Sequence, residues 1–142
     1  MTVLPDFPLR TIAVLTTVDP TPHAIPVSAP VRVSDTTILL SLQRTRDSLA
    51  RLREDPAVAL TVLTEGDVAF TARGRARVVR ESLESDADYA GVAIEVEHVD
   101  DHRQPAFTVD AGVGRQWRDA GEKQRLGARV GELGALTCAP AR

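Results

Sequence analysis

The residues from Val68 to Val79 alternate between two kinds of side chain, and this alternation constrains the fold more than any other feature. One set is apolar or small: Val68, Phe70, Ala72, Gly74, Ala76 and Val78. The other set is mostly polar: Ala69, Thr71, Arg73, Arg75, Arg77 and Val79. Successive side chains of a strand point to opposite faces of a sheet, so a period of two predicts a long strand with one buried face.

Further strands are predicted on both sides of this one, at residues 11–18, 23–33, 37–42, 57–63 and 92–97, with a short one at 106–109. Pro26 and Pro30 interrupt the second of them, so it is expected at a sheet edge or with a bulge. The short turns between the first three strands favour an antiparallel meander. Glu65-Gly66-Asp67 predicts a hairpin.

Two segments have helical character. Leu49 and Leu52 are three residues apart among charges, which predicts a helix over 47–55, capped by Thr45 or Asp47. Residues 115–126 predict a polar helix, and residues 130–142 are rich in Gly and Ala, as in a flexible tail. A length of 142 residues suits one domain, 1–142. Six or seven strands with one short helix between the third and fourth indicate a mainly β protein, a closed antiparallel barrel.

The charge balance, 17 basic against 20 acidic residues, argues against a nucleic-acid partner. The Arg73, Arg75 and Arg77 stripe is expected to pair with Glu95 and Glu97 on a neighbouring strand, with RNA binding as the alternative. The absence of an apolar run of about 20 residues argues against a membrane span. The first ten residues contain no signal-peptide core, so we expect a cytoplasmic protein. Its single cysteine, Cys138, excludes an internal disulfide framework and a cysteine-based zinc cluster.

Few residues suggest conventional catalysis. His98, Asp100, Asp101 and His102 include metal-ligating types, but strand alternation turns neighbours apart, so we interpret them as a polar strand end and predict no metal site. Ser28 and Ser41 have no nearby His–Asp partner, and the catalytic residues stay unknown. Trp117 is expected to pack in the core or at a subunit interface, with a position over a cofactor as the alternative.

The segment from Ser41 to Ser48 is the best candidate for a binding site. It places Arg44 and Arg46, together with three hydroxyl groups, at the end of a strand and on the first turn of a helix. Free N–H groups at a helix N-terminus and the forked donors of arginine both favour a phosphate. The alternative is an ordinary capped helix with solvated arginines.

From about residue 7 to residue 80 the chain resembles the pyridoxamine 5′-phosphate oxidase-like flavoproteins, which include flavin and deazaflavin reductases. Three stretches carry the resemblance by their order and spacing. They are IAVLTTVD at 12–19 followed by Pro22-His23 and Pro26-Val27, LREDPAVAL at 52–60, and GRARVV at 74–79. Beyond residue 90 the resemblance is weaker, and the family's residues for a substrate phosphate find no match there.

The resemblance implies an FMN-binding split barrel that forms a homodimer and acts on a small-molecule redox substrate. By position in the family, Ile25, Pro26, Val27, Ser28, Ser41 and Leu42 would flank the flavin ring. The phosphate would lie near Arg44, Thr45, Arg46 and Ser48. Many members have Lys or Arg where this chain has Asp47 and Ser48, so Arg44 and Arg46 are expected to supply that charge. The alternatives are a deazaflavin cofactor, a non-catalytic flavin-binding protein, and a barrel that has lost its cofactor.

Overall fold

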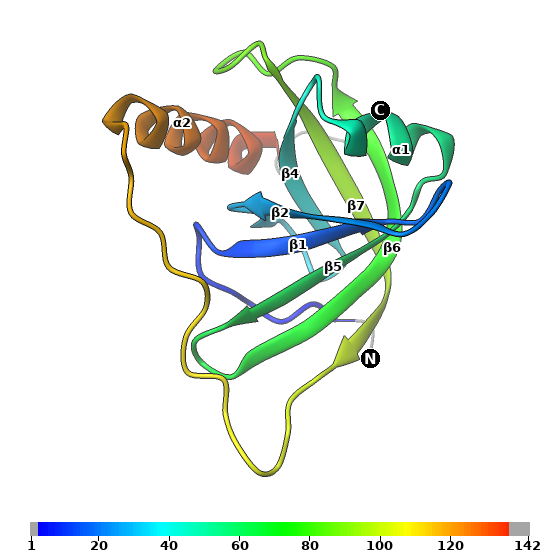
Figure 1. Cartoon of the computed structure of the whole chain (residues 1–142), viewed down its shortest axis with the longest axis vertical. Helices are drawn as coiled ribbons and strands as arrows, with labels where there is room; N and C mark the ends of the chain where they lie inside the picture. Colours follow the sequence, from blue (N-terminus) through cyan, green and yellow to red (C-terminus); the bar gives the residue numbers. More distant parts are fainter. Residues whose placement is uncertain (1–2, 137–142) are drawn as a thin grey trace.

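The protein forms one curled antiparallel sheet with two helices (Figure 1), in a computed structural model that describes residues 3–136. The strands are β1 (Ile12–Thr17), β2 (His23–Ser28), β3 (Val31–Arg32), β4 (Thr37–Gln43), β5 (Ala57–Thr64), β6 (Val68–Arg80) and β7 (Tyr89–Asp101). The helices are α1 (Asp47–Glu54) and α2 (Ala120–Leu136), and neither could span a membrane. The predicted mainly β architecture, an antiparallel split barrel of six or seven strands, is confirmed with seven strands. The expected closure of the barrel is corrected, because β2 and β3 do not pair with each other in the described chain.

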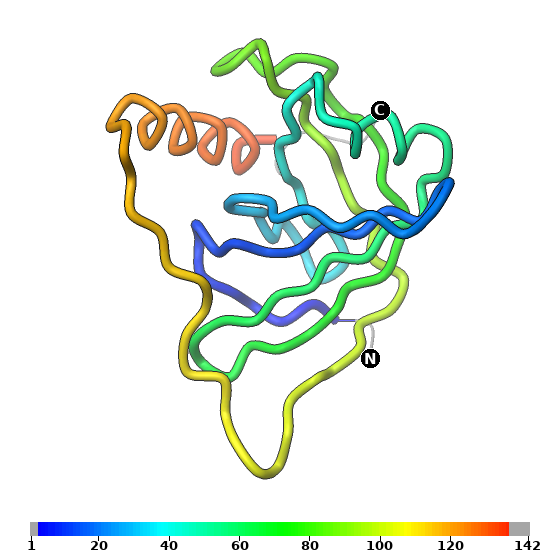
Figure 2. The backbone as a smooth tube through the Cα atoms, viewed as in Figure 1, coloured from blue at the N-terminus to red at the C-terminus, as the bar shows by residue number. Residues whose placement is uncertain are grey.

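The order of strands across the sheet is β2-β1-β5-β6-β7-β4-β3, so β2 and β3 lie at opposite ends of it. Only Ala29 and Pro30 separate these two strands in sequence. The chain therefore crosses from one end of the sheet to the other within two residues, which requires the sheet to curl into a barrel (Figure 2). The single strand expected over residues 23–33 is corrected to two strands. Ala29 has a φ of 56°, and its N–H donates to the Thr11 carbonyl at 2.8 Å.

Side chains that point into the barrel form the main core. Its largest fully buried members on the strands are Leu15, Ile38, Leu40, Leu60, Val62, Phe70, Val92 and Ile94. Helix α1 adds Leu49 and Leu52, the leucines whose spacing predicts the helix. Phe7 packs against Phe70, with the ring centroids 6.1 Å apart. Each such large side chain contributes about 1.5–3 kcal/mol by leaving water.

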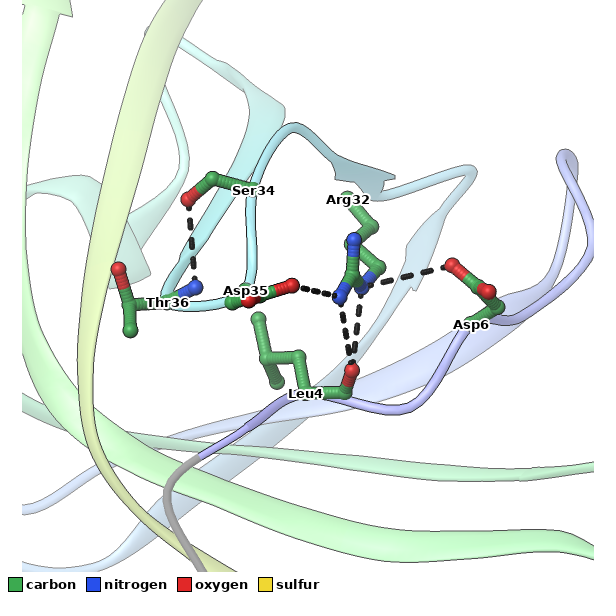
Figure 3. Close-up of polar contacts among 6 residues, drawn as sticks. All are labelled: Leu4, Asp6, Arg32, Ser34, Asp35 and Thr36. Carbon is green, nitrogen blue, oxygen red and sulfur yellow. Dashed lines mark hydrogen bonds and ion pairs between the residues drawn. The ribbon is translucent and has the colours of Figure 1, made fainter.

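Arg32 of β3 joins the N-terminal segment to the turn between β3 and β4 (Figure 3). The Nε and Nη2 atoms of Arg32 donate to the Leu4 carbonyl at 3.1 and 3.0 Å, and Nη2 also donates to Asp35 at 2.7 Å. Asp6 adds an ion pair at 3.5 Å. The Leu4 N–H donates to the Asp35 carbonyl, and the Leu4 side chain is fully buried. The guanidinium group of Arg32 therefore holds the N-terminal segment against β3 and Asp35.

Strands β6 and β7 form the longest pair, as the alternation in β6 predicts. Arg73 pairs with Asp100 at 2.9 Å and Arg77 with Glu95 at 3.5 Å, so acidic partners on β7 do neutralise part of the arginine stripe. Glu97, which was also expected to pair with the stripe, forms no ion pair with a described residue. Arg73 pairs with Asp100 instead, because the register shifts at a bulge next to Gly74.

The polar cluster at residues 98–102 lies at the end of β7, as expected. Asp100 is bound by Arg73, Asp101 is bound by Arg103, and His102 forms a hydrogen bond to Thr71 at 2.8 Å. The strand predicted at residues 106–109 is wrong, since the described chain has only an isolated bridge there. Val109 instead exchanges hydrogen bonds with Asp67 in the β5–β6 hairpin. These hydrogen bonds to the hairpin satisfy the N–H and C=O groups of Val109, which in a strand would bond to a neighbouring strand.

The C-terminal helix differs from its prediction at both ends. It begins at Ala120, where Asp119 accepts hydrogen bonds from the first turn, and it continues to Leu136. The flexible tail expected over 130–142 is thereby corrected for residues 130–136. These residues are helical because Leu133 is buried in a second apolar cluster, formed with Val31, Leu39, Leu83 and Ala93. Residues 137–142, which include Cys138, lie outside the described residues.

Candidate functional site

The candidate site is a seam between two strand segments, Ile25–Ser28 of β2 and Ser41–Gln43 of β4. Within the described residues, β2 pairs only with β1, and Ser41–Gln43 pairs only with β7. The two facing edges therefore leave backbone N–H and C=O groups available to a ligand. A cavity of about 100 Å³ lies in the seam, lined by Ile25, Pro26, Val27, Ser28, Ser41, Leu42, Gln43, Arg46, Tyr89 and Arg129.

The seam brings together most residues predicted to bind the cofactor, but they do not all offer side chains. Ile25, Val27 and Leu42 are buried in the barrel core, so they contribute mainly backbone to the seam. The half-buried Ser28 and Ser41 have the opposite strand parity, which places their hydroxyls on the outer side. The seam is therefore apolar on the side that faces the barrel core and polar on the outer side of the sheet.

Arg44 and Thr45 line a neighbouring, more open cavity of about 490 Å³, together with Gln43 and Asp88. Neither Arg44 nor Arg46 forms an ion pair with any described residue, so both guanidinium groups are available to an anion. Ser48 is buried on the inner side of α1 and stands apart from the described lining of both cavities.

The start of α1 departs from the predicted cap. The N-cap is Arg46, with no side-chain cap among the described residues, so the expected caps Thr45 and Asp47 are wrong. Instead of capping the helix, the Asp47 carboxylate accepts a hydrogen bond from Arg51, with 2.7 Å between Arg51 Nε and Asp47 Oδ2. This hydrogen bond, with the charge attraction, lowers the pKa of Asp47. Arg51 also donates to the Asp19 and Thr21 carbonyls, which fastens α1 to the β1–β2 hairpin.

Arg129 is the main site residue that the sequence prediction missed. Its side chain is only 7% exposed, its Nη1 donates to Asp86 at 2.9 Å, and its Cζ lies 3.7 Å from the centre of the Tyr89 ring. One signal was present: Arg129 lies three residues after Leu126 and four before Leu133, on the face that the helix buries. An arginine at such a position indicates a specific partner.

Arg115 closes the Ser28 end of the seam. It donates to the Ser28 hydroxyl at 3.1 Å and to the Arg10 carbonyl at 3.2 Å, and it stacks on Trp117 at 5.4 Å. Burial, and then repulsion from Arg10, lowers the pKa of Arg115. Trp117 is 37% exposed and belongs to neither apolar cluster, so the expected packing in the core is corrected to stacking against Arg115.

The seam's size limits what one chain can enclose. Pockets that surround a drug-sized ligand hold about 300–1,000 Å³. A cavity of about 100 Å³ therefore fits a small anion or one polar edge of a larger molecule. The hydrogen-bond donors of the seam are of the types that a flavin requires. N–H groups at a strand edge can bind the polar edge of the ring, and arginines can bind the phosphate. A complete flavin would need a second surface.

Comparison with known proteins bears on the fold and family. The profile of a family described as pyridoxamine 5′-phosphate oxidase matches residues 5–128. No curated protein matches the chain.

Several solved structures are similar in fold. A Listeria innocua protein, provisionally described as a pyridoxamine 5′-phosphate oxidase, is 16% identical with a TM-score of 0.54, over 66% of this chain and 90% of that one. A FAD-binding protein from Mesorhizobium loti is 15% identical with a TM-score of 0.52, over 63% and 81%. An F420 reductase is 15% identical with a TM-score of 0.53, over 66% and 92%.

Proposed function

The chain belongs to the pyridoxamine 5′-phosphate oxidase family, and from that premise we propose that it is an FMN-binding oxidoreductase. It acts as a homodimer on a small-molecule redox substrate. The observation that carries the proposal is the seam, where two strand edges with available backbone groups lie beside the arginines Arg44 and Arg46. The descriptions of the Mesorhizobium loti protein and the F420 reductase support a flavin-type ligand.

The roles of the residues follow from their positions along the seam. FMN would supply the hydride chemistry, so the protein needs no conventional acid–base pair of its own. Backbone groups of Ile25–Ser28 and Ser41–Leu42 hydrogen-bond the ring's polar edge, while Arg44, Thr45 and Arg46 bind the phosphate. Ser48, which is buried, contributes by supporting the start of α1.

The homodimer is proposed from the outer face of the sheet next to the seam. Val14 of β1 lies between Pro26 of β2 and Thr61 of β5, and Pro26 also lines the seam. Val14 is 40% exposed and Leu63 of β5 is 50% exposed, so this face presents apolar surface beside the half-formed site. A second copy packed there would bury that surface and supply the second wall that a flavin requires.

Oligomeric state tests this part of the proposal. Sedimentation of the parent protein is expected to give a dimer, and Leu63→Lys is expected to give monomer with weaker FMN binding. Lys123→Ala, on an exposed part of α2, serves as the control. A parent protein that sediments as a monomer while binding FMN fully would refute the shared site.

Flavin binding itself is tested by absorbance and by quenching of FMN fluorescence. The Arg44→Ala/Arg46→Ala double variant is expected to bind FMN about tenfold or more weakly, because it loses charge-assisted hydrogen bonds. Arg75→Ala is the matched control, since Arg75 is exposed on β6 and forms no ion pair with a described residue. Unchanged affinity in the double variant would remove both arginines from the site.

Three alternatives stay open as outcomes of these measurements. Retention of a deazaflavin instead of FMN would change the cofactor but keep the seam as its site. Retention of neither would favour a barrel without a cofactor, and retention without reduction by NAD(P)H or another donor would favour a non-catalytic binding protein. We propose a cytoplasmic location, which suits a chain with one cysteine and no disulfide.

A further inference from the structure

Helix α2 adds a charged group to the seam, and the position of that group is specific. Arg129 and Arg46 line the same cavity of about 100 Å³, with the Ser28 and Ser41 hydroxyls. Among the described lining residues there is no carboxylate. Asp86 balances one of the two guanidinium charges from outside that lining, which leaves the cavity with net positive charge.

The hydrogen bonds of Arg129 are incomplete among the described residues. Its Nη1 donates to Asp86, but its Nε is buried and has no partner. A buried polar group without a partner is rare in native proteins, and a missing ligand or water is a common explanation. The ring of Tyr89 stacks on the guanidinium group and fixes its plane, so the donors are held in place beside the cavity.

A purely structural role explains this arrangement less well. The neighbouring Glu132 already fastens α2 to the loop before β7, since it accepts hydrogen bonds from the Glu84 and Ser85 N–H groups at 3.0 and 2.7 Å. Leu126 and Leu133 supply the apolar contact of the helix. A buried ion pair often stabilises a protein no better than apolar side chains of similar volume. Arg129 therefore serves more than the attachment of the helix.

We propose that Arg129 and Arg46 form a subsite for an oxyanion, a carboxylate or phosphate group of the ligand that occupies the seam. A cavity of about 100 Å³ suits such a group, and arginine binds oxyanions through paired, directional N–H donors. Which ligand carries the oxyanion, a substrate or the cofactor, rests on the proposed function. Binding of a simple phosphate ion needs no flavin and can be tested on the protein alone.

The test follows the arginine side-chain N–H signals of the full ¹⁵N-labelled chain by NMR while inorganic phosphate is added. The signal absent from Arg129→Lys identifies the Arg129 Nε–H, which is expected to shift and saturate with phosphate but not with chloride at equal ionic strength. Arg125→Lys, on the exposed side of the same helix, is the control and is expected to bind phosphate normally.

A second variant tests the subsite even if Arg129→Lys does not fold. Arg46 is exposed and forms no ion pair with a described residue, so Arg46→Gln is expected to fold and to bind phosphate about tenfold or more weakly. No phosphate-dependent shift of Arg129, or equal phosphate affinity in Arg46→Gln and the parent, would overturn the subsite.

Addition of flavin then separates the two sources of the oxyanion. If FMN displaces phosphate and riboflavin does not, the subsite holds the cofactor's phosphate. If phosphate stays bound beside FMN, the subsite takes an anionic substrate, and Arg46 then binds that substrate instead of the FMN phosphate. If phosphate binds but neither flavin nor deazaflavin does, the subsite stands and the proposed function fails.

Discussion

Leu133→Ala should release helix α2 from the barrel without unfolding the barrel. Leu133 is 1% exposed and packs in a small cluster that is separate from the main core. Loss of a buried leucine costs about 2–5 kcal/mol when the surroundings cannot collapse. The fully buried apolar anchors of α2 are Leu126 and Leu133, and each contributes about 1.5–3 kcal/mol. The substitution therefore removes a large share of the free energy that holds the helix in place.

Hydrogen exchange measured by mass spectrometry distinguishes the two parts of the molecule. Peptides covering residues 120–136 are expected to exchange about tenfold or more faster, since about 1.4 kcal/mol of lost docking gives that factor. Peptides from β5 and β6 should keep their protection, because their core does not include Leu133. Lys123→Ala, exposed on the same helix, is the control. Equal loss of protection in α2 and in the barrel strands would refute the separation into two clusters.

Three other substitutions test particular contacts. Gly74→Ala would place a Cβ 2.0 Å from the Glu95 carbonyl oxygen, so chemical denaturation should show a loss of about 1–3 kcal/mol or more. Arg32→Met keeps the apolar stem but loses the bonds to the N-terminal segment, and urea unfolding should show a loss of about 1–3 kcal/mol. Hydrogen bonding to Arg103 lowers the pKa of Asp101 to about 2, below the ordinary value of 3.8 for an aspartate. This pair therefore stabilises the fold above pH 3.8, and its contribution is lost as pH falls toward 2. Arg103→Gln should raise the Asp101 pKa in a carboxyl NMR titration.

The parts of the fold that the sequence predicts are those governed by local patterns. The alternation in β6 and the leucine spacing in α1 are such patterns, and both elements form where they are expected. The length of α2 could not be predicted in this way. Its last turns are helical because Leu133 packs in an apolar cluster that includes Leu39, a residue far away in the sequence. The same packing explains why Arg129 was missed, since Arg129 reaches the seam only through the docking of α2 on the sheet.

The candidate site, too, has parts that local sequence patterns predict and parts that they do not. Family resemblance alone indicated β2 and β4 as neighbours, because nothing local to either strand says that their edges face each other. The prolines Pro26 and Pro30 predicted a sheet edge or a bulge, and β2 does lie at the edge of the sheet. The positive φ of Ala29, where the chain crosses to β3, had no signal in the sequence. Alanine rarely adopts that conformation, and its place at the crossing reflects the hydrogen bond to Thr11.

The two-residue crossing between β2 and β3 also determines how the seam can open. Ser28 and Val31 are joined by three peptide units, which at full stretch reach about 11 Å, so the two edges cannot separate far at that end. The opposite end, at Gln43 and Arg44, has no chain link this short to β2; in the described chain, Arg51 of α1 joins it to the β1–β2 hairpin through hydrogen bonds to the Asp19 and Thr21 carbonyls. Side-chain hydrogen bonds can break and re-form whereas the two-residue link cannot lengthen, so the two edges separate more easily at the arginine end than at Ser28. A ligand that enters at the arginine end would place a small leading group near Ser28. A longer ligand would extend further out of the seam beyond Arg44.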